Sequence, residues 1–282
     1  MTSILISSDD PQIGEDIAHR LAQDAGFDYV GQSLLDEIAK QKDVTRNQLE
    51  WALEGTGGRR LSKPQRALLQ SYIQTATLEA LMKDNVVCFG LAAHLHVYGV
   101  SHLLHLRVLA NPAERHRALT QDKGYSDKKA AKVLEKERGL RSRHTLESFG
   151  VDECDPALYD IVVQLKQISP ERVIQIVRDT AELRGFATMT YSRNCLADLL
   201  RASRIREALL PEFQDLRVVA DGDRVIVHVK CSNRVRNKVI AQIKETASAV
   251  ENVTLVEVHT VRNLREVSDG RDRDPGVMLY GE

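Results

Sequence analysis

Four apolar runs are spaced along the first two thirds of the chain, and each has the length of a buried β-strand. The first of them, residues 3–7, is mostly apolar, which is typical of a strand covered on both faces of a parallel sheet. The others cover residues 85–92, 103–110 and 159–165. Segments with helical periodicity lie between the runs, so the pattern predicts an α/β fold in which helices cover both faces of a parallel sheet.

Apolar stripes and capping residues mark the helices between these runs. Ile13, Ile17 and Leu21 recur with the spacing of one helix face, directly after the first apolar run. A long helix is predicted over residues 62–83, because a capping box opens at Ser62. Further helices are predicted over residues 34–41, 45–53, 112–121, 127–138 and 169–184.

The pattern changes after Gly185, where short-chained polar residues predict a linker over residues 186–195. Residues 196–262 then predict the order helix, strand, strand, helix, strand, with Asp221-Gly222 as a hairpin turn between the first two strands. We therefore expect three parts besides the linker: a larger α/β domain at residues 1–185, a small α+β domain at 196–262 and a polar tail at 263–282.

The composition limits the class of protein. With 39 basic and 40 acidic side chains among 282 residues, the chain has no basic field for nucleic acid or for an anionic membrane. Aromatic residues, at 5%, are too few for the stacking platforms of single-strand binding. The longest apolar run, residues 86–93, is too short for a transmembrane segment. We expect a soluble cytoplasmic protein with reduced cysteines and no nucleic-acid partner.

No set of residues has the spacing of a metal site. The acidic segment 9–16 offers carboxylates to a hard cation, but it lacks the spacing of an EF-hand loop. Four histidines are close in sequence without a carboxylate or cysteine at metal-ligand spacing, and we interpret them as structural: His94, His96, His102 and His105. We predict no bound metal ion.

The connection between the first strand and the first helix has the position of a phosphate-binding loop and the opposite chemistry. Such a loop needs inward-facing backbone N–H groups, usually at glycines, and a cation nearby. Residues 9–16 contain one glycine, Gly14, together with four acidic residues and no lysine. Asp10 before Pro11 also has the pattern of an N-cap, which would place a carboxylate where an external phosphate binds.

Six stretches in order carry a resemblance to a known family: ISSDDPQIGEDIAHRLA, GFDYVGQSLLDEIA, VVCFGLA, LRVLANPAERHRAL, KGYSDKKAAKVLEKERG and CDPALYDIVVQ. They span about the first 180 residues, and this part of the chain resembles the cytidylate kinase-like family of P-loop nucleoside monophosphate kinases. The resemblance implies a parallel sheet with flanking helices and a nucleoside monophosphate as partner.

Taken position by position, the resemblance implies a degenerate phosphate loop and a retained lid. The loop cation is replaced by Glu15, and the arginine of the glycine–arginine–glycine turn is replaced by Leu91. Reversing the sign of a charge about 4 Å from a phosphate changes their interaction by about 8 kcal/mol at an effective dielectric of 20. Lid-type arginines persist at Arg115 and Arg138, the catalytic candidates. The resemblance assigns nucleotide binding to Ser7, Ser8, Gly14, Gly90, Arg141 and Arg143.

The second part of the chain, residues 196–261, resembles a BON domain. This resemblance implies binding to membranes or protein partners rather than catalysis. The helix at residues 234–244 places basic side chains on its outer face and apolar ones toward the sheet. The absence of a GxxG loop within residues 196–261 disfavours a KH-type RNA-binding domain.

Three functions follow from the sequence. The leading hypothesis is a catalytically impaired relative of cytidylate kinase that binds a nucleotide or a partner and acts as a regulatory protein. The alternative is an active kinase that transfers phosphate from ATP, with Mg²⁺, to CMP or a similar monophosphate, for which Arg59, Arg60 or the lid arginines must replace the missing lysine. In the third hypothesis the BON-like domain is the working part, and the helix at residues 62–83 forms the seam of a homodimer.

Overall fold

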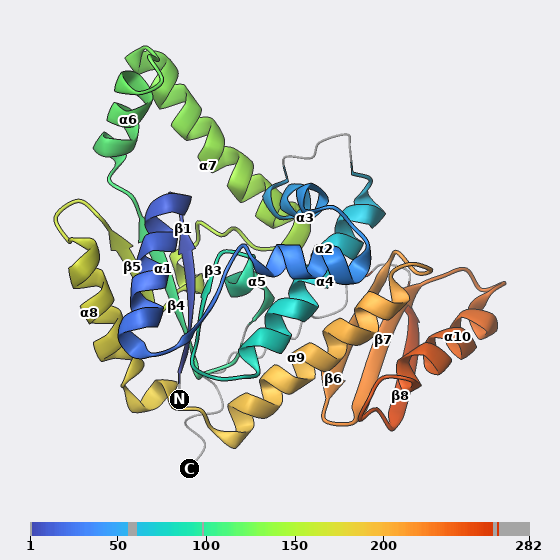
Figure 1. Cartoon of the computed structure of the whole chain (residues 1–282). Coiled ribbons are helices and arrows are strands. Elements are labelled where there is room, and N and C mark those ends of the chain that lie inside the picture. The colour runs from blue at the N-terminus through green and yellow to red at the C-terminus, as the bar shows by residue number, and fades with distance from the viewer. Residues whose placement is uncertain (1, 56–60, 98, 262–263, 265–282) are drawn as a thin grey trace.

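The computed structural model describes residues 2–55, 61–97, 99–261 and 264, and it contains two sheets (Figure 1). The larger sheet has the strand order β2-β3-β1-β4-β5, and all neighbouring strands are parallel. Its strands are β1 (Ser3–Ser8), β2 (Asp28–Val30), β3 (Val86–Phe89), β4 (Leu103–Leu109) and β5 (Ile161–Gln164). The predicted α/β fold class with a parallel sheet is therefore confirmed.

Helices cover both faces of this sheet. Alternate residues of each strand point to opposite sides, and the apolar side chains on both sides are buried against helices. Ile4 and Ile6 of β1 pack against α1 (Pro11–Ala25) and α8 (Pro170–Ala181). Leu5 points the other way, into a core built with the later helix α9 (Thr190–Leu209) and with four earlier helices. These are α2 (Leu34–Lys42), α3 (Arg46–Glu54), α4 (Lys63–Leu81) and the short α5 (Ala93–His96).

Helices α6 (Pro112–Gln121) and α7 (Asp127–Phe149) form a hairpin that projects from the carboxyl edge of the sheet (Figure 1). The sequence predicts that the second of these helices ends at Arg138, but it continues through Gly139 and stops only at Gly150. Gly150 takes a positive φ of 75° at the helix C-terminus, a conformation that glycine adopts at little cost. The longer helix reaches back toward the sheet and brings residues after Arg138 over its edge.

The predicted linker is wrong in its second half. A short 3-10 helix covers Arg184–Phe186, and helix α9 (Thr190–Leu209) begins soon after it. The first half of α9 packs Leu196 and Leu200 into the core that contains α4. This packing anchors the helix, and the polar residues 190–195, which the sequence assigned to the linker, form its first turns. The hydroxyls of Thr75 and Ser203 form a buried hydrogen bond of 2.9 Å between the two helices.

The second half of α9 belongs to a smaller unit with its own core. It packs with α10 (Arg236–Ser248) on a three-stranded sheet of order β6-β7-β8. The hairpin of β6 (Leu216–Asp221) and β7 (Arg224–Lys230) is antiparallel and turns at the predicted glycine, whereas β8 (Leu255–Val261) lies parallel to β7. This is the predicted helix-strand-strand-helix-strand order; the resemblance to BON domains stays a prediction. Nearly all of the predicted tail at 263–282 lies outside the described residues.

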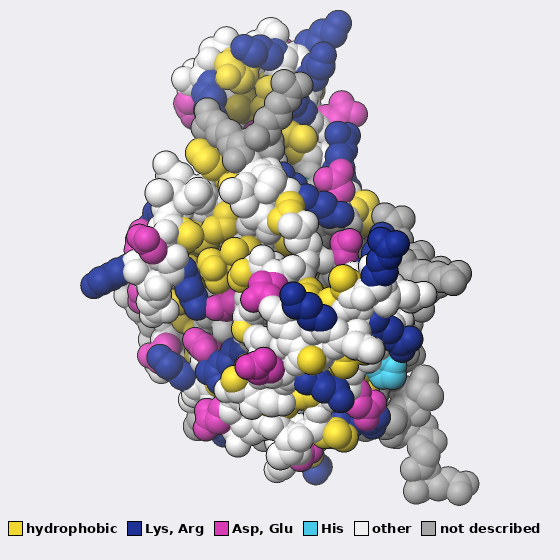
Figure 2. Space-filling view, turned by 90° about the vertical axis from the view of Figure 1, so that its right-hand side faces the viewer, with side chains coloured by type: hydrophobic (Ala, Val, Ile, Leu, Met, Phe, Trp, Pro, Cys, Tyr) yellow, Lys and Arg dark blue, Asp and Glu magenta, His cyan; other side chains and the backbone are white. Residues whose placement is uncertain are grey.

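The surface offers no support for the predicted dimer seam on α4. This helix is covered within the chain by α2, α3, α5 and α9. Basic and acidic side chains are interspersed on the face that carries the small unit, in line with the near-zero net charge (Figure 2). Within the described part of the chain, none of the helices combines the length and the apolar character needed to cross a bilayer.

Candidate functional site

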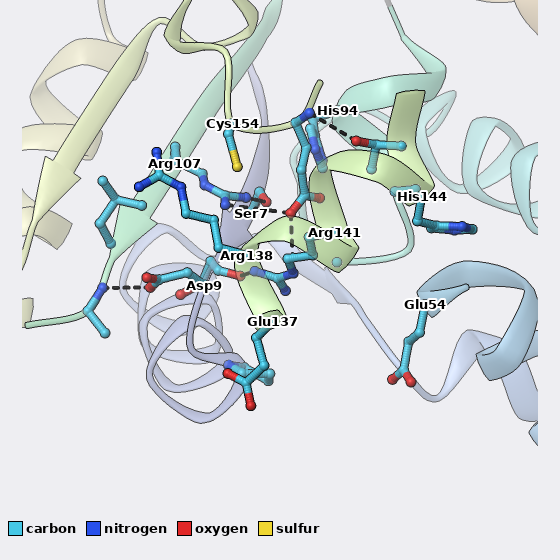
Figure 3. Close-up of a pocket in the computed structure, with 18 of the residues that line it drawn as sticks. Ser7, Asp9, Glu54, His94, Arg107, Glu137, Arg138, Arg141, His144 and Cys154 are labelled. Atoms are coloured by element: carbon cyan, nitrogen blue, oxygen red, sulfur yellow. Dashed lines mark hydrogen bonds and ion pairs between the residues drawn. The ribbon is translucent and has the colours of Figure 1, made fainter. Parts of the chain in front are cut away.

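A cavity of about 990 Å³ lies at the carboxyl edge of the larger sheet, between the ends of β1, β3, β4 and β5 and helix α7. Open parallel sheets bind ligands at this edge, where the strand order reverses. Figure 3 shows Arg107, Arg138 and Arg141 on the same side of the cavity as Ser7 and Asp9, with His144 on the other side.

Arg107 is a buried cation in the middle of the apolar strand β4. Its Nη1 donates a 2.5 Å hydrogen bond to the Ser7 hydroxyl, and its Nη2 lies 3.6 Å from the Glu153 carboxylate. The guanidinium also lies over the ring of Tyr159, 5.8 Å from its centroid. Burial raises the pKa of Tyr159 to about 12, although the nearby Arg107 opposes that shift.

Arg141 reaches the same place from helix α7. Its Nη1 donates a 2.9 Å hydrogen bond to the carbonyl oxygen of Ser8, at the end of β1. Its Nε lies 3.2 Å from Oε1 of Glu153. Glu153 therefore lies between two guanidinium groups that come from different elements, Arg107 on β4 and Arg141 on α7.

Arg115 on α6 is held by two carboxylates. It lies 3.3 Å from Asp9 and 3.0 Å from Glu137. The other oxygen of Asp9 accepts a 2.7 Å hydrogen bond from the backbone N–H of Ala110. These contacts tie the β1–α1 connection to the base of the α6–α7 hairpin.

Arg138 differs from the other three arginines of the cavity. No described residue forms a hydrogen bond or an ion pair with its guanidinium. Its positive charge helps to lower the pKa of Asp152. The larger causes of that shift are hydrogen bonds from the Cys154 N–H and the Ser142 hydroxyl. Arg138 is thus a cation at the cavity wall that is available to an anionic ligand.

His94 closes the inner end of the cavity as a neutral group. It is 7% exposed, stacks on Tyr159 with ring centroids 5.4 Å apart, and its Nε2 finds no hydrogen-bond partner among the described residues. Burial lowers its pKa well below the usual value, and the nearby His105 and Arg107 act in the same direction. The imidazole therefore adds no charge to the cavity wall.

The predicted N-cap at the start of α1 is confirmed. Strand β1 ends at Ser8 and the helix begins at Pro11, so only Asp9 and Asp10 separate them. The Asp10 carboxylate accepts hydrogen bonds from the N–H groups of Gln12 and Ile13, at 3.1 and 3.2 Å. The N–H groups that bind phosphate at other helix N-termini are satisfied here from within the chain.

Comparison with known proteins identifies the family of the chain. The model of the Cytidylate kinase-like family matches residues 10–167 of the 282-residue chain. The chain belongs to the cytidylate kinase-like family. A solved structure titled as an uncharacterized protein from Eubacterium ventriosum ATCC 27560 is 16% identical, with a TM-score of 0.47; the alignment covers 65% of this chain and all of that one. No curated protein matches the chain.

Within this cytidylate kinase-like domain, most of the predicted site residues come together. Six of them line the cavity: Ser7, Ser8, Gly90, Arg115, Arg138 and Arg141. Arg143 is exposed on α7 outside the lining, and Gly14 is buried in α1. A Cβ on Gly14 would come within 2.5 Å of the Phe89 ring and of Ser8, so this glycine permits close packing of α1 on the sheet.

Two charged residues of the cavity, Arg107 and Glu153, were not predicted from the sequence. Arg107 carried a readable signal, because a lone charge inside an apolar parallel strand must find a buried partner. Glu153 carried none, because it lies in an irregular segment after α7, where no periodic pattern indicates that its side chain is buried beside two arginines. Arg59 and Arg60, the predicted substitute cations, lie outside the described residues. Among the described residues, no group of three or more His, Cys, Asp and Glu side chains is placed to hold a metal ion.

Proposed function

We propose that the cavity binds the phosphate group of a nucleotide, in the first place a nucleoside monophosphate. The observation that carries the proposal is Arg138, an unpaired guanidinium, among the described residues, in a cavity that also presents Arg107 and Arg141. Arginine matches the planar, multi-oxygen surface of a phosphate with paired N–H donors. The volume of about 990 Å³ lies at the upper end of the range for small-molecule sites.

Membership of the cytidylate kinase-like family supports a nucleotide as the ligand. The cavity lies at the sheet edge where parallel α/β folds bind nucleotides. His94 and Tyr159 provide the uncharged part of the wall, with one ring stacked on the other. Such a wall suits the base or sugar of a nucleotide, while the arginines suit its phosphate.

We further propose that phosphoryl transfer from ATP is impaired. Transfer depends on positioning and on neutralising the charge of the phosphates. Asp10 takes up the N–H groups at the start of α1, and Glu15 stands where active relatives carry a cation, with its carboxylate bonded to the Tyr29 hydroxyl at 3.2 Å. A magnesium triphosphate does not fit this connection, and we assign no step to it.

Calorimetric titration of the full chain tests both parts of the proposal. We expect CMP to bind without Mg²⁺, and ATP to bind weakly whether Mg²⁺ is present or not. Arg138→Ala is expected to weaken CMP binding about ten- to a hundredfold, the worth of a charge-assisted contact. Arg143→Ala, which removes the same charge outside the cavity, serves as the matched control and is expected to bind normally.

The second candidate is an active kinase for a CMP-type monophosphate, with ATP and Mg²⁺ as cosubstrate and cofactor. The observation that favours it is the set of four arginines gathered at the cavity from three elements. A coupled assay for ADP release in the presence of CMP separates the two candidates. CMP-dependent release that Arg138→Ala abolishes would favour the kinase and contradict the impaired reading.

A protein that binds a nucleotide without converting it can act only through a difference between its bound and free states. We therefore propose a regulatory role. Helix α9 supports this proposal because it contributes to the cores of both units. Hydrogen exchange measured with and without CMP tests it. Altered protection in the second half of α9 and in the small sheet is expected; a change confined to the cavity would contradict it.

A further inference from the structure

Two of the cavity's arginines are already bridged by an anion that belongs to the chain. The Glu153 carboxylate lies 3.2 Å from Arg141 and 3.6 Å from Arg107. The residue is only 7% exposed, yet it lines the same cavity that we assign to the phosphate. It thus occupies a position between two guanidinium groups that a phosphate oxygen would take.

The main chain around Glu153 is firmly fixed. Its N–H donates a 3.1 Å hydrogen bond to the Thr145 hydroxyl, and its carbonyl oxygen accepts one of 2.8 Å from Tyr159. The preceding Asp152 accepts a 2.7 Å hydrogen bond from Ser142. Because the backbone is tied to α7, the part of Glu153 that can move is the end of its side chain.

The bridge itself is a charge attraction with poor directional bonding. Oε1 of Glu153 is buried, and no described residue gives it a hydrogen bond of good geometry, although the two guanidinium groups are close. A buried polar atom left in this state is costly. A phosphate monoester carries three acceptor oxygens and a charge near −2 at neutral pH, so it satisfies the same donors better than one carboxylate oxygen does.

We propose that Glu153 is a tethered substitute for the ligand's phosphate, and that displacing it makes the cavity selective for phosphate monoester dianions over monoanions. The inference rests on the proposed function. A monoanion that replaces the carboxylate between Arg107 and Arg141 only exchanges one negative charge for another. A dianion adds a charge, engages the unpaired Arg138 as well, and repels the Glu153 side chain outward.

The test compares CMP with 3′,5′-cyclic CMP, which has the same base and sugar but a monoanionic diester. Calorimetry on the full-length chain at pH 7.5 is expected to show CMP binding at least about tenfold tighter than cyclic CMP. In Glu153→Gln the binding of cyclic CMP is expected to tighten by about tenfold, so that the ratio falls. Inorganic phosphate, titrated in parallel, reports on the anion site without the base.

Glu135→Gln is the matched control. Glu135 is exposed on α7 and lines the same cavity, so the substitution removes one negative charge without touching the two bridged arginines. It is expected to leave the CMP to cyclic CMP ratio unchanged. Glu153→Asp keeps the charge but shortens the side chain by one methylene, and it is expected to shift the ratio in the same direction as Glu153→Gln. Glu153→Asp decides the question if Glu153→Gln does not fold.

The outcomes separate the inference from the proposed function. If neither CMP nor phosphate binds the wild-type chain, the proposed function fails and the inference fails with it. If CMP binds and Arg138→Ala weakens it, but folded Glu153 variants bind CMP less tightly at an unchanged ratio, then Glu153 positions the arginines. That result overturns the inference and leaves the proposed function standing.

Discussion

At the scale of single residues, the contact between Arg107 and Glu153 is a buried ion pair whose loss is expected to lower stability. Their side chains are 5% and 10% exposed, so each charge depends on its partner for solvation. We expect Arg107→Met to lower the free energy of unfolding by about 2–3 kcal/mol, somewhat less than the loss of a fully isolated buried pair, because Arg141 still faces Glu153. Urea denaturation followed by circular dichroism measures the change.

The double variant provides the control for this prediction. Adding Glu153→Gln to Arg107→Met removes the charge left behind, so most of the lost stability is expected to return. A double variant no more stable than Arg107→Met alone would show that Arg107 acts through packing on Tyr159 and not through its charge.

At the scale of elements, the proposed loss of phosphoryl transfer depends on the start of α1. Asp10 accepts from two backbone N–H groups at once. Asp10→Ala is expected to lower the free energy of unfolding by about 1 kcal/mol, since a cap is lost. Asp10→Ser retains a capping oxygen and is expected to stay within about 0.5 kcal/mol of the wild type. Equal losses in both variants, measured by urea denaturation, would mean that the carboxylate charge matters more than the cap.

The elements were predicted from the sequence to the extent that their patterns are local. The four apolar runs predicted four of the five strands of the parallel sheet, all except β2, and the capping signals at Asp10 and Ser62 placed two helix starts correctly. The extension of α7 beyond Arg138 has no apolar stripe, because that part of the helix faces the cavity. The first turns of α9 were missed for a related reason: their helical state depends on tertiary packing of Leu196 and Leu200.

At the scale of the whole molecule, several buried histidines couple stability to pH. Burial lowers the pKa of His94, His102, His105 and His144 below the usual 6.5. When the pH falls below 6.5, these histidines become protonated in the unfolded chain but stay neutral in the folded chain. The free energy of unfolding therefore decreases as the pH falls. The loss is at most about 1.4 kcal/mol per pH unit for each such histidine, and it ends once the pH falls below the pKa of that histidine in the folded state.

Urea denaturation at intervals from pH 7.5 to pH 5.0 measures this dependence. The range lies above the region in which the carboxylates with lowered pKa, such as Asp152, contribute. We expect the free energy of unfolding to fall steadily below pH 6.5. Constant stability across this range would contradict the assignment of neutral buried histidines.

Helix α9 makes the two units interdependent, because its apolar side chains belong to two different cores. Leu196 and Leu200 are buried with α4 in the kinase-like unit, and Ile205 and Leu209 are buried in the small unit. A chain that ends at residue 210 keeps the first contacts, whereas a chain that ends at residue 193 loses them and exposes apolar surface worth about 1.5–3 kcal/mol for each leucine. We therefore expect the shorter chain to melt at a clearly lower temperature and to bind a hydrophobic dye. If both truncated chains melted at the same temperature, α9 would be a connector and not a shared part of the core.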